Sequence, residues 1–365
     1  MAFDLSTLKT LLKKERGPSG NERAFLGIDI GASAIKIVQL KNVRNVPTLE
    51  TYGELQLGPY ESIDIGRGTR LPQNKLIEAL IDILRESSAT STSATYSFSY
   101  NTSFTNTISI PTINQEQIAS MLPIEARKYI PISLSKVTLD WIPLGINEKN
   151  KETKILLTAI YNDAIEKYNA VLQGAKLTTV ASEIEIFSSI RSVVSQSDEV
   201  VVILDWGATA TRMYIIEKGV VRKTHSVLMS GITLTEGIAQ DLNIDFIEAE
   251  EIKRTYGLLG KTDEPRVQKS LTKEIERGLR ELHTVSARYE RDEGVCAKKI
   301  ILSGGGAVLK GLDVFVQDVL SLPVERANPF NKVAYPAFLE DTLQVVGPSF
   351  SIAVGTALRA MQNLK

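Results

Sequence analysis

Two short segments of the chain carry the same pattern: an apolar strand, an Asp-x-Gly-Ala turn and a second strand. The first spans residues 25–38 with Asp29 before its turn, and the second spans residues 204–214 with Asp205 in the equivalent place. Apolar residues on both sides of a short glycine-containing turn predict a β-hairpin. Because the same hairpin occurs twice, we expect an internal structural duplication, with one copy in each of two lobes.

The size and charge of the chain agree with a two-lobed globular protein. It has 365 residues, 43% of them hydrophobic, whereas single hydrophobic cores stop growing near roughly 250–300 residues. The net charge of -1, without a long block of like charge, gives no indication of a nucleic-acid partner. A single cysteine, no signal-peptide pattern at the start and no apolar run near the ~20 residues that span a bilayer predict a cytoplasmic protein. We expect any contact with a membrane to be made through a surface or a partner.

Four parts follow from the apolar periodicity. Residues 1–21 predict an amphipathic helix and a linker; the helix would dock on its own fold or, alternatively, bind a membrane surface or partner. Residues 22–198 predict the first lobe, and within it residues 89–161 predict a small α+β subdomain. Residues 199–335 predict the second lobe, and residues 336–365 predict a C-terminal helix that returns to the first lobe.

Both turns have the composition of a phosphate-binding loop. Glycine leaves backbone N–H groups open to a phosphate, Lys36 adds a positive charge, and Thr211 adds a hydroxyl donor. Asp29 and Asp205 are hard oxygen ligands that would hold a hydrated Mg²⁺ between the lobes. A single Asp-x-Gly turn is also an ordinary hairpin turn. The candidate phosphate contacts in the two turns are Gly31, Ala32, Ser33, Gly207, Ala208 and Thr209.

A glycine run adds a third element to the pattern. Gly304, Gly305 and Gly306 follow an apolar strand and precede a segment where a helix can begin. Consecutive glycines in this place permit the close approach of a flat base or ribose to the backbone. A glycine run alone is only a flexible loop, but after two phosphate-type turns it completes a specific pattern.

In this order and separation, DIGASAIK, DWGATAT and SGGGAVLKGL resemble the phosphate-1, phosphate-2 and adenosine motifs of the actin-like ATPase superfamily. Within it, the chain is similar to the PilM family of type IV pilus assembly proteins, relatives of the cell-division protein FtsA. That likeness rests on EARKYIPISLSKVTLDW, SGITLTEGIAQDL and AEEIK, and it covers about residues 25–359. It implies an α/β fold of the duplicated, ribonuclease H-like actin type, with two lobes and an FtsA-like α+β subdomain inserted in the first.

The resemblance also implies ligands and partners. ATP would bind in a cleft between the lobes, with Glu250 and Lys253 near its ribose or base, although helix spacing alone would explain these two as a solvated ion pair. A groove beside the inserted subdomain would take the short cytoplasmic N-terminal peptide of a PilN-like membrane protein, and Trp141 and Tyr100 are aromatic candidates for contacting it. Other pilus platform or motor proteins are further expected partners, and self-association stays open.

Two departures from the family pattern bear on turnover. Trp206 stands where a small aliphatic residue is usual, so a bulky ring must fit beside the second turn. Glu183 stands where the family usually has aspartate; Glu183 or Glu185 could position a water for hydrolysis, and both could also be ordinary surface carboxylates. We take Glu183 as the catalytic candidate and expect slow ATP turnover or none, with ATP closing the lobes.

Two other functions compete with a PilM-type scaffold. An FtsA-like filament protein would end in a linker and a membrane-binding helix, whereas this chain ends in ALRAMQNLK. A small-molecule kinase of the same superfamily would need a general-base aspartate besides Asp29 and Asp205. The sequence does not indicate which aspartate would be that general base.

Overall fold

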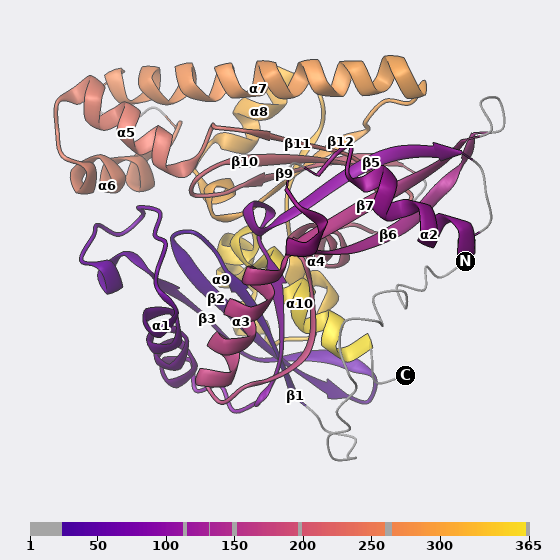
Figure 1. Ribbon diagram of the computed structural model, residues 1–365. Helices are drawn as coiled ribbons and strands as arrows, with labels where there is room; N and C mark the ends of the chain where they lie inside the picture. The colour runs from indigo at the N-terminus through magenta and orange to yellow at the C-terminus, as the bar shows by residue number, and fades with distance from the viewer. Residues whose placement is uncertain are drawn as a thin grey trace.

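The computed structural model describes residues 24–111, 115–130, 132–147, 152–195, 199–259 and 265–362. The helix and linker expected over residues 1–21 lie outside these ranges. The described strands form two five-stranded sheets and one three-stranded sheet. Figure 1 shows the second lobe at the top, under the long helix α7 (Pro265–Glu293), and the first lobe below it.

The first sheet has the strand order β3-β2-β1-β4-β8. β1 and β2 are antiparallel around the first predicted turn, whereas β1, β4 and β8 run parallel. The long hairpin partner β3 forms one edge of the sheet. The strands are β1 (Ala24–Ile30), β2 (Ala34–Val43), β3 (Val46–Gln56), β4 (Ser93–Phe98) and β8 (Thr178–Ile184).

The second sheet repeats this topology in the order β11-β10-β9-β12-β13. β9 and β10 are antiparallel around the second predicted turn, and β9, β12 and β13 run parallel. The duplication expected from the two turns is therefore present in the strand pairing itself. The strands are β9 (Val200–Trp206), β10 (Thr211–Glu217), β11 (Val220–Val227), β12 (Lys299–Ser303) and β13 (Val324–Arg326).

Helices cover both sheets. In the first lobe, α1 and α3 share a core with Leu26, Ile28 and Ile30 of β1, and α10 packs on the other face. In the second lobe, α5, α7 and α8 share a core with β9 and β12. The helices are α1 (Gln73–Glu86), α3 (Asn162–Gly174), α4 (Glu185–Val193), α5 (Gly231–Leu242), α6 (Phe246–Tyr256), α8 (Leu312–Leu320), α9 (Glu340–Val346) and α10 (Ser351–Gln362).

A small subdomain is inserted between β4 and α3. Its antiparallel sheet has the order β5-β7-β6, and one helix, α2, packs on it through Ile118, Leu122 and Ala126. This unit is the predicted α+β subdomain. Its elements are β5 (Ser103–Pro111), α2 (Gln115–Ala126), β6 (Val137–Asn147) and β7 (Glu152–Tyr161).

The subdomain begins later than the sequence indicated. The predicted range, residues 89–161, includes β4, but β4 pairs with β1 and β8 in the first sheet. The alternation of Tyr96 and Phe98 with small polar residues suggests a half-buried strand, whereas β4 is buried along nearly its whole length, as a parallel strand covered on both faces is. The inserted unit therefore starts near residue 99.

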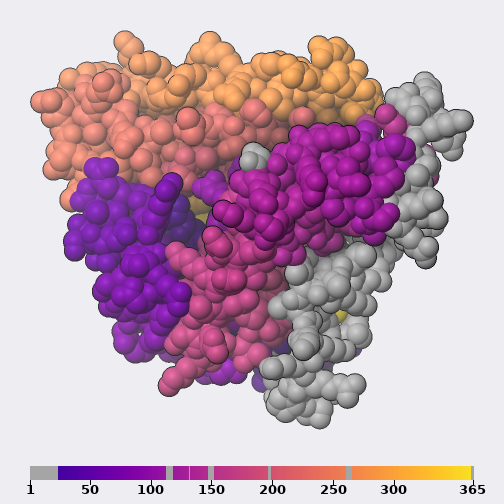
Figure 2. Space-filling view, in the orientation of Figure 1, coloured from indigo at the N-terminus to yellow at the C-terminus, as the bar shows by residue number. Residues whose placement is uncertain are grey.

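Polar contacts join the subdomain to the second lobe. Thr107 Oγ1 donates a hydrogen bond to Arg222 O (3.1 Å), and Arg222 Nη1 donates one to Leu144 O (3.1 Å). Lys154 pairs with Glu293 at the end of α7, with 2.7 Å between Nζ and Oε1. Figure 2 shows the subdomain, in magenta, lying directly against the second lobe, in orange.

Helix α10 approaches the first sheet at backbone distance. A Cβ at Gly27 would overlap Ala353 O and come within 2.4 Å of Ala357 N, and a Cβ at Gly355 would overlap Ser188 O of α4. The close packing therefore requires glycine at position 27, where β1 meets α10, and at position 355, where α10 meets α4. It anchors the C-terminal segment on β1, directly before the first turn.

We expect Gly27→Ala to destabilise the protein by roughly 2–4 kcal/mol, because the added methyl group must push α10 off β1. Urea denaturation measures the change. Gly305→Ala is the matched control, since a Cβ there meets nothing within 4 Å, and it should shift stability by about 0.5 kcal/mol or less. Equal effects of the two substitutions would contradict this account of the packing.

Candidate functional site

A cleft of ≈ 1330 Å³ opens between the two lobes. Both predicted turns and the glycine loop line it, so the three motifs that lie far apart in the sequence meet in one place. The lining includes Asp29, Gly31, Ala32, Ser33, Lys36, Asp205, Gly207, Ala208, Thr209, Glu250, Lys253, Gly304, Gly305 and Gly306.

The two turns have the same geometry. Gly31 N donates a hydrogen bond to Ala34 O, and Gly207 N donates one to Ala210 O, both at 3.0 Å. The second turn also receives hydrogen bonds from the first residues of α5, where Gly231 N donates to Gly207 O at 3.0 Å. The start of α5 therefore lies against the second turn at the cleft wall.

Two buried carboxylates lie near the turn ends of β1 and β9. Asp29 and Asp205 are 8% and 4% exposed. Burial raises the pKa of Asp29 to about 6, against the opposing charge of Lys36, and burial also raises the pKa of Asp205. Each charged carboxylate is costly to hold in this place, which indicates a site built to face positive charge.

Arg212 lies beside Asp205, and no sequence motif identified it. Its guanidinium Nη1 lies 3.3 Å from Glu185 Oε1 and 3.9 Å from Asp205 Oδ2, and its Cζ lies 5.3 Å from the ring centroid of Tyr100. Burial raises the pKa of Glu185 to about 7, although Arg212 opposes the shift. Arg212 comes from β10 and Glu185 from α4, so this buried ion pair joins the two lobes.

A buried network forms the wall opposite the first turn. Lys253 Nζ donates to Glu250 Oε2 (2.6 Å) and to Gly231 O (2.9 Å), and Arg254 Nε donates to Glu250 Oε1 (2.6 Å). Burial alone would raise the pKa of Glu250, but the charge of Lys253 and the hydrogen bonds from Lys253, Thr235 and Arg254 together outweigh burial, so the pKa lies below its usual value. Glu250 and Lys253 are each 8% exposed, so they are not a solvated surface pair.

A loop of the first lobe reaches this wall. Gly66 has a φ of 92°, and a Cβ there would come within 3.1 Å of the Glu250 carboxyl group. The guanidinium of Arg67 lies 3.9 Å from the ring centroid of Phe246 in α6, a cation–π contact across the lobes. The loop thus closes one rim of the cleft.

The glycine loop packs tightly on the second turn. Gly304 has a φ of 86°, and a Cβ there would lie 2.5 Å from Asp205 Oδ1, while a Cβ at Gly306 would overlap the ring of Trp206. Gly306 therefore makes the room that the bulky ring of Trp206 needs. Gly305, in contrast, faces open space.

Comparison with known proteins decides the family. The family model for type IV pilus assembly protein PilM matches residues 27–361. The chain belongs to the PilM family.

Solved structures support the same assignment. A structure of the "PilM-PilN type IV pilus biogenesis complex" is similar with a TM-score of 0.78 and 26% identity, over 92% of this chain and 98% of that one. Ethanolamine utilization protein EutJ from Carboxydothermus hydrogenoformans gives a TM-score of 0.54 at 17% identity, over 97% and 95% of the two chains. MreB5 of Spiroplasma citri bound to ADP gives a TM-score of 0.51 at 12% identity, over 93% of this chain and 97% of that one. The predicted two-lobe actin-like α/β fold is confirmed.

Two predicted site residues of this PilM-family chain lie elsewhere. Glu183 does not line the cleft: Arg191 Nη2 donates to its Oε2 (2.7 Å) and Ser188 Oγ to its Oε1 (2.5 Å). Thr211 is fully buried and donates its hydroxyl to Met229 O (2.6 Å). Glu183 and Glu185 are both buried, so neither is a surface carboxylate, and Glu185 is the one in the cleft.

The carboxylates fit a metal only in part. Among the described residues, no group of three or more His, Cys, Asp and Glu side chains could hold a metal ion. Asp29 and Asp205 could hold the waters of one Mg²⁺, but the guanidinium of Arg212 already lies beside Asp205. Several buried polar atoms around the cleft have no hydrogen-bond partner in the described part of the chain: Glu185 Oε1, Trp206 Nε1, Arg212 Nε and Ser303 Oγ. These atoms suit a polar ligand.

No helix in the described part of the chain is both long and apolar enough to cross a bilayer.

Asp29→Asn should stabilise the protein at pH 7.5 by roughly 1–3 kcal/mol, because it removes a buried charge. The folded-state pKa of about 6 exceeds the ordinary value of 3.8 for an aspartate, so the folded protein holds the proton more tightly. The loss of folding free energy caused by the buried charge in the wild type is complete above pH 6, and it disappears as the pH falls below about 4. Thermal unfolding of both proteins from pH 4 to 8 measures this convergence.

The matched control is Glu54→Gln, an exposed carboxylate that also lines the cleft. Its effect should be small. A gain in Asp29→Asn that stays constant across the pH range would rule out charge burial as its cause.

Proposed function

We propose that the chain is a cytoplasmic, ATP-binding scaffold of a type IV pilus or related secretion platform, bound to the inner membrane through a PilN-like protein. The observation that carries this proposal is the likeness, over nearly the whole chain, to the PilM–PilN complex, together with membership of the PilM family. The cleft adds independent physical support, because it brings three nucleotide-type motifs together between two lobes.

In this proposal the two turns and Lys36 contact the phosphates. Backbone N–H groups of glycine turns and a nearby ammonium group are a common device for binding polyphosphates. The open space at Gly305 would accept the nucleoside, and Lys253 and Glu250 would border it. Mg²⁺ is the component that the site fits only in part, with Asp29 and Asp205 as the carboxylates that would hold its waters.

Glu185 takes the role that the sequence had assigned to Glu183. It lines the cleft, and its pKa of about 7 suits a group that accepts a proton from water. Its ion pair with Arg212 holds the carboxylate in place and lowers its basicity. We therefore propose slow hydrolysis, with ATP serving chiefly to stabilise the closed lobes.

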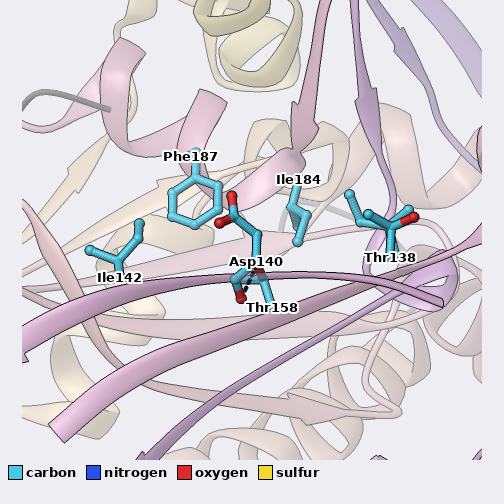
Figure 3. A pocket seen from close by; sticks show the side chains of 7 residues that line it. Thr138, Asp140, Ile142, Thr158, Ile184 and Phe187 are labelled. Carbon is cyan, nitrogen blue, oxygen red and sulfur yellow. Dashed lines mark hydrogen bonds between the residues drawn. The ribbon is translucent and has the colours of Figure 1, made fainter. Parts of the chain in front are cut away.

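For the PilN-like peptide we propose the pocket between the inserted subdomain and α4. The face of β6 and β7 opposite α2 lines it together with β8 and α4, and Figure 3 shows the side chains gathered there. The walls are apolar, with one carboxylate, Asp140, whose pKa is raised by burial. The lining residues are Thr138, Asp140, Ile142, Thr158, Ile160, Ile184 and Phe187.

The two aromatic residues expected to contact the peptide do not line this pocket. Trp141 packs with α2 on the other face of the sheet, and Tyr100 lies beside Arg212. The pocket volume is ≈ 20 Å³, about the room that one water molecule needs, so the pocket must open before an apolar side chain can enter. An apolar side chain next to a basic group would match both the walls and Asp140.

Gly305→Val should weaken ATP binding by about tenfold or more, because its side chain fills the space proposed for the nucleoside. The fold should stay intact, since nothing lies within 4 Å of a Cβ there. Titration with a fluorescent ATP analogue, with the thermal unfolding midpoint as control, measures both. Unchanged affinity would place the nucleoside elsewhere.

Phe187→Ala and Asp140→Asn should each weaken binding of a synthetic PilN N-terminal peptide by about fivefold or more, through lost apolar contact and lost charge respectively. Fluorescence polarisation of the labelled peptide measures the affinity. Ile124→Ala, on the exposed side of α2, is the matched control and should bind normally. If the control and the pocket variants bind alike, the peptide site lies outside this pocket.

A further inference from the structure

We propose that Arg212 supplies, inside the cleft, the positive charge that a divalent cation would otherwise supply, so that this chain binds a nucleoside triphosphate without requiring Mg²⁺. The inference rests on the proposed nucleotide site and deepens it. It concerns the residue that the structure, and not the sequence motifs, brought into the site.

The position of Arg212 is fixed by the hairpin. It is the cross-strand neighbour of Asp205 in the β9–β10 pair, and its side chain is 9% exposed. A Cβ at Gly207 would lie 3.8 Å from Arg212 Nη1, so the guanidinium lies next to the turn that would hold phosphate. Its charge is thus placed among the carboxylates and beside the proposed phosphate contacts.

The local charge balance shows why this matters. Three buried carboxylates, Asp29, Asp205 and Glu185, share this region with two cations, Lys36 and Arg212. Without Arg212, one lysine would face three acids, and a polyphosphate would be repelled in a low-dielectric cleft. In such a site a metal ion usually neutralises the excess negative charge, but here the Arg212 guanidinium already neutralises part of it.

The guanidinium also disfavours a metal in the same place. An arginine stays protonated at any pH that a folded protein tolerates, so its charge is permanent. A divalent ion bound at Asp205 would lie close to a cation that is 3.9 Å from the same carboxylate, and the two would repel each other. The positive charge of Arg212 therefore already lies beside Asp205 and Glu185 when no metal ion is bound.

A donor remains for the nucleotide. Arg212 lines the cleft, and its buried Nε has no hydrogen-bond partner within the described residues. Ser303 Oγ, which is also buried and lines the cleft, has none either. An anionic oxygen entering the cleft would satisfy donors that are costly to leave unpaired. This separates Arg212 from an ordinary buried ion pair, whose donors are fully used.

The test compares nucleotide binding with and without free divalent cation. A fluorescent ATP analogue is titrated into the full-length protein in excess Mg²⁺ and in excess EDTA. We expect the wild-type affinity to change by about threefold or less between the two conditions. In a second measurement, Mg²⁺ alone is titrated into nucleotide-free protein by calorimetry, with no binding expected.

Arg212→Met removes the charge and keeps the length of the side chain. We expect its ATP affinity in EDTA to fall by about tenfold or more and to recover in part with Mg²⁺, and we expect it to bind Mg²⁺ alone. Arg212→Lys, which keeps a positive charge, should retain binding in EDTA. Arg254→Met is the matched control, because Arg254 lines the same cleft but pairs with Glu250; it should leave the response to Mg²⁺ unchanged.

Loss of Arg212 leaves Glu185 buried and unpaired, so Arg212→Met could fail to fold. The double variant Arg212→Met/Glu185→Gln removes both charges of the pair, and it should fold and still show the new dependence on Mg²⁺. Its folding is checked by thermal unfolding before any titration.

Three results would overturn the inference. Wild-type binding that is lost in EDTA, or an Arg212→Met protein with the wild-type response to Mg²⁺, would remove the role of Arg212 and leave the proposed function standing. Absence of ATP binding under both conditions would overturn the nucleotide part of the proposed function itself, and the role of Arg212 with it.

Discussion

The two lobes meet over a small group of buried charges, and the rest of the cleft depends on how those charges are balanced. Asp29, Asp205 and Glu185 are taken out of water together with Arg212, and Lys36 lies half-buried beside them. Burying an unpaired charge costs several kcal/mol, so each carboxylate must keep a cation within reach. Because Arg212 and Glu185 belong to different lobes, this requirement holds the lobes together as well as shaping the site.

Hairpin geometry decides which side chains reach that group of charges. A turn of the same length in both lobes places an aspartate at the end of the leading strand, and the strand pairing then sets Lys36 opposite Asp29 and Arg212 opposite Asp205. The duplication therefore yields two acid–base cross-strand pairs in equivalent places. The close packing of α10 on Gly27 holds the first hairpin in place, and the close packing of the glycine loop on Trp206 holds the second.

The sequence was informative where the function depends on backbone geometry. Turns, glycine loop and lobe order could be predicted, because glycine and alternating apolar residues leave a local signal. It was less informative for side-chain direction. Glu183 ends in an ion pair with Arg191 while Glu185 enters the cleft, because the chain changes from β8 to α4 between Ile184 and Glu185. No local pattern distinguishes the two glutamates.

Arg212 was missed for a related reason. An arginine inside a run of apolar strand residues has no counterpart in the turn pattern, and its nearer partner, Glu185, comes from α4 of the other lobe. A buried charge in such a strand is itself a signal, since a strand covered on both faces rarely contains one unpaired. The identity of the partner, however, depends on contacts between residues far apart in the sequence.

The segment that follows β8 connects the two proposed sites. Glu185 lines the nucleotide cleft, while Ile184 and Phe187, on either side of it, line the pocket under the inserted subdomain. The other wall of that pocket belongs to a subdomain held to the second lobe by Arg222 and by the pair Lys154–Glu293. A change in the angle between the lobes would therefore change the spacing between the two walls of the pocket. By thermodynamic linkage, if a ligand in the cleft changes the affinity of the pocket for its ligand by some factor, the ligand in the pocket changes the affinity of the cleft by the same factor.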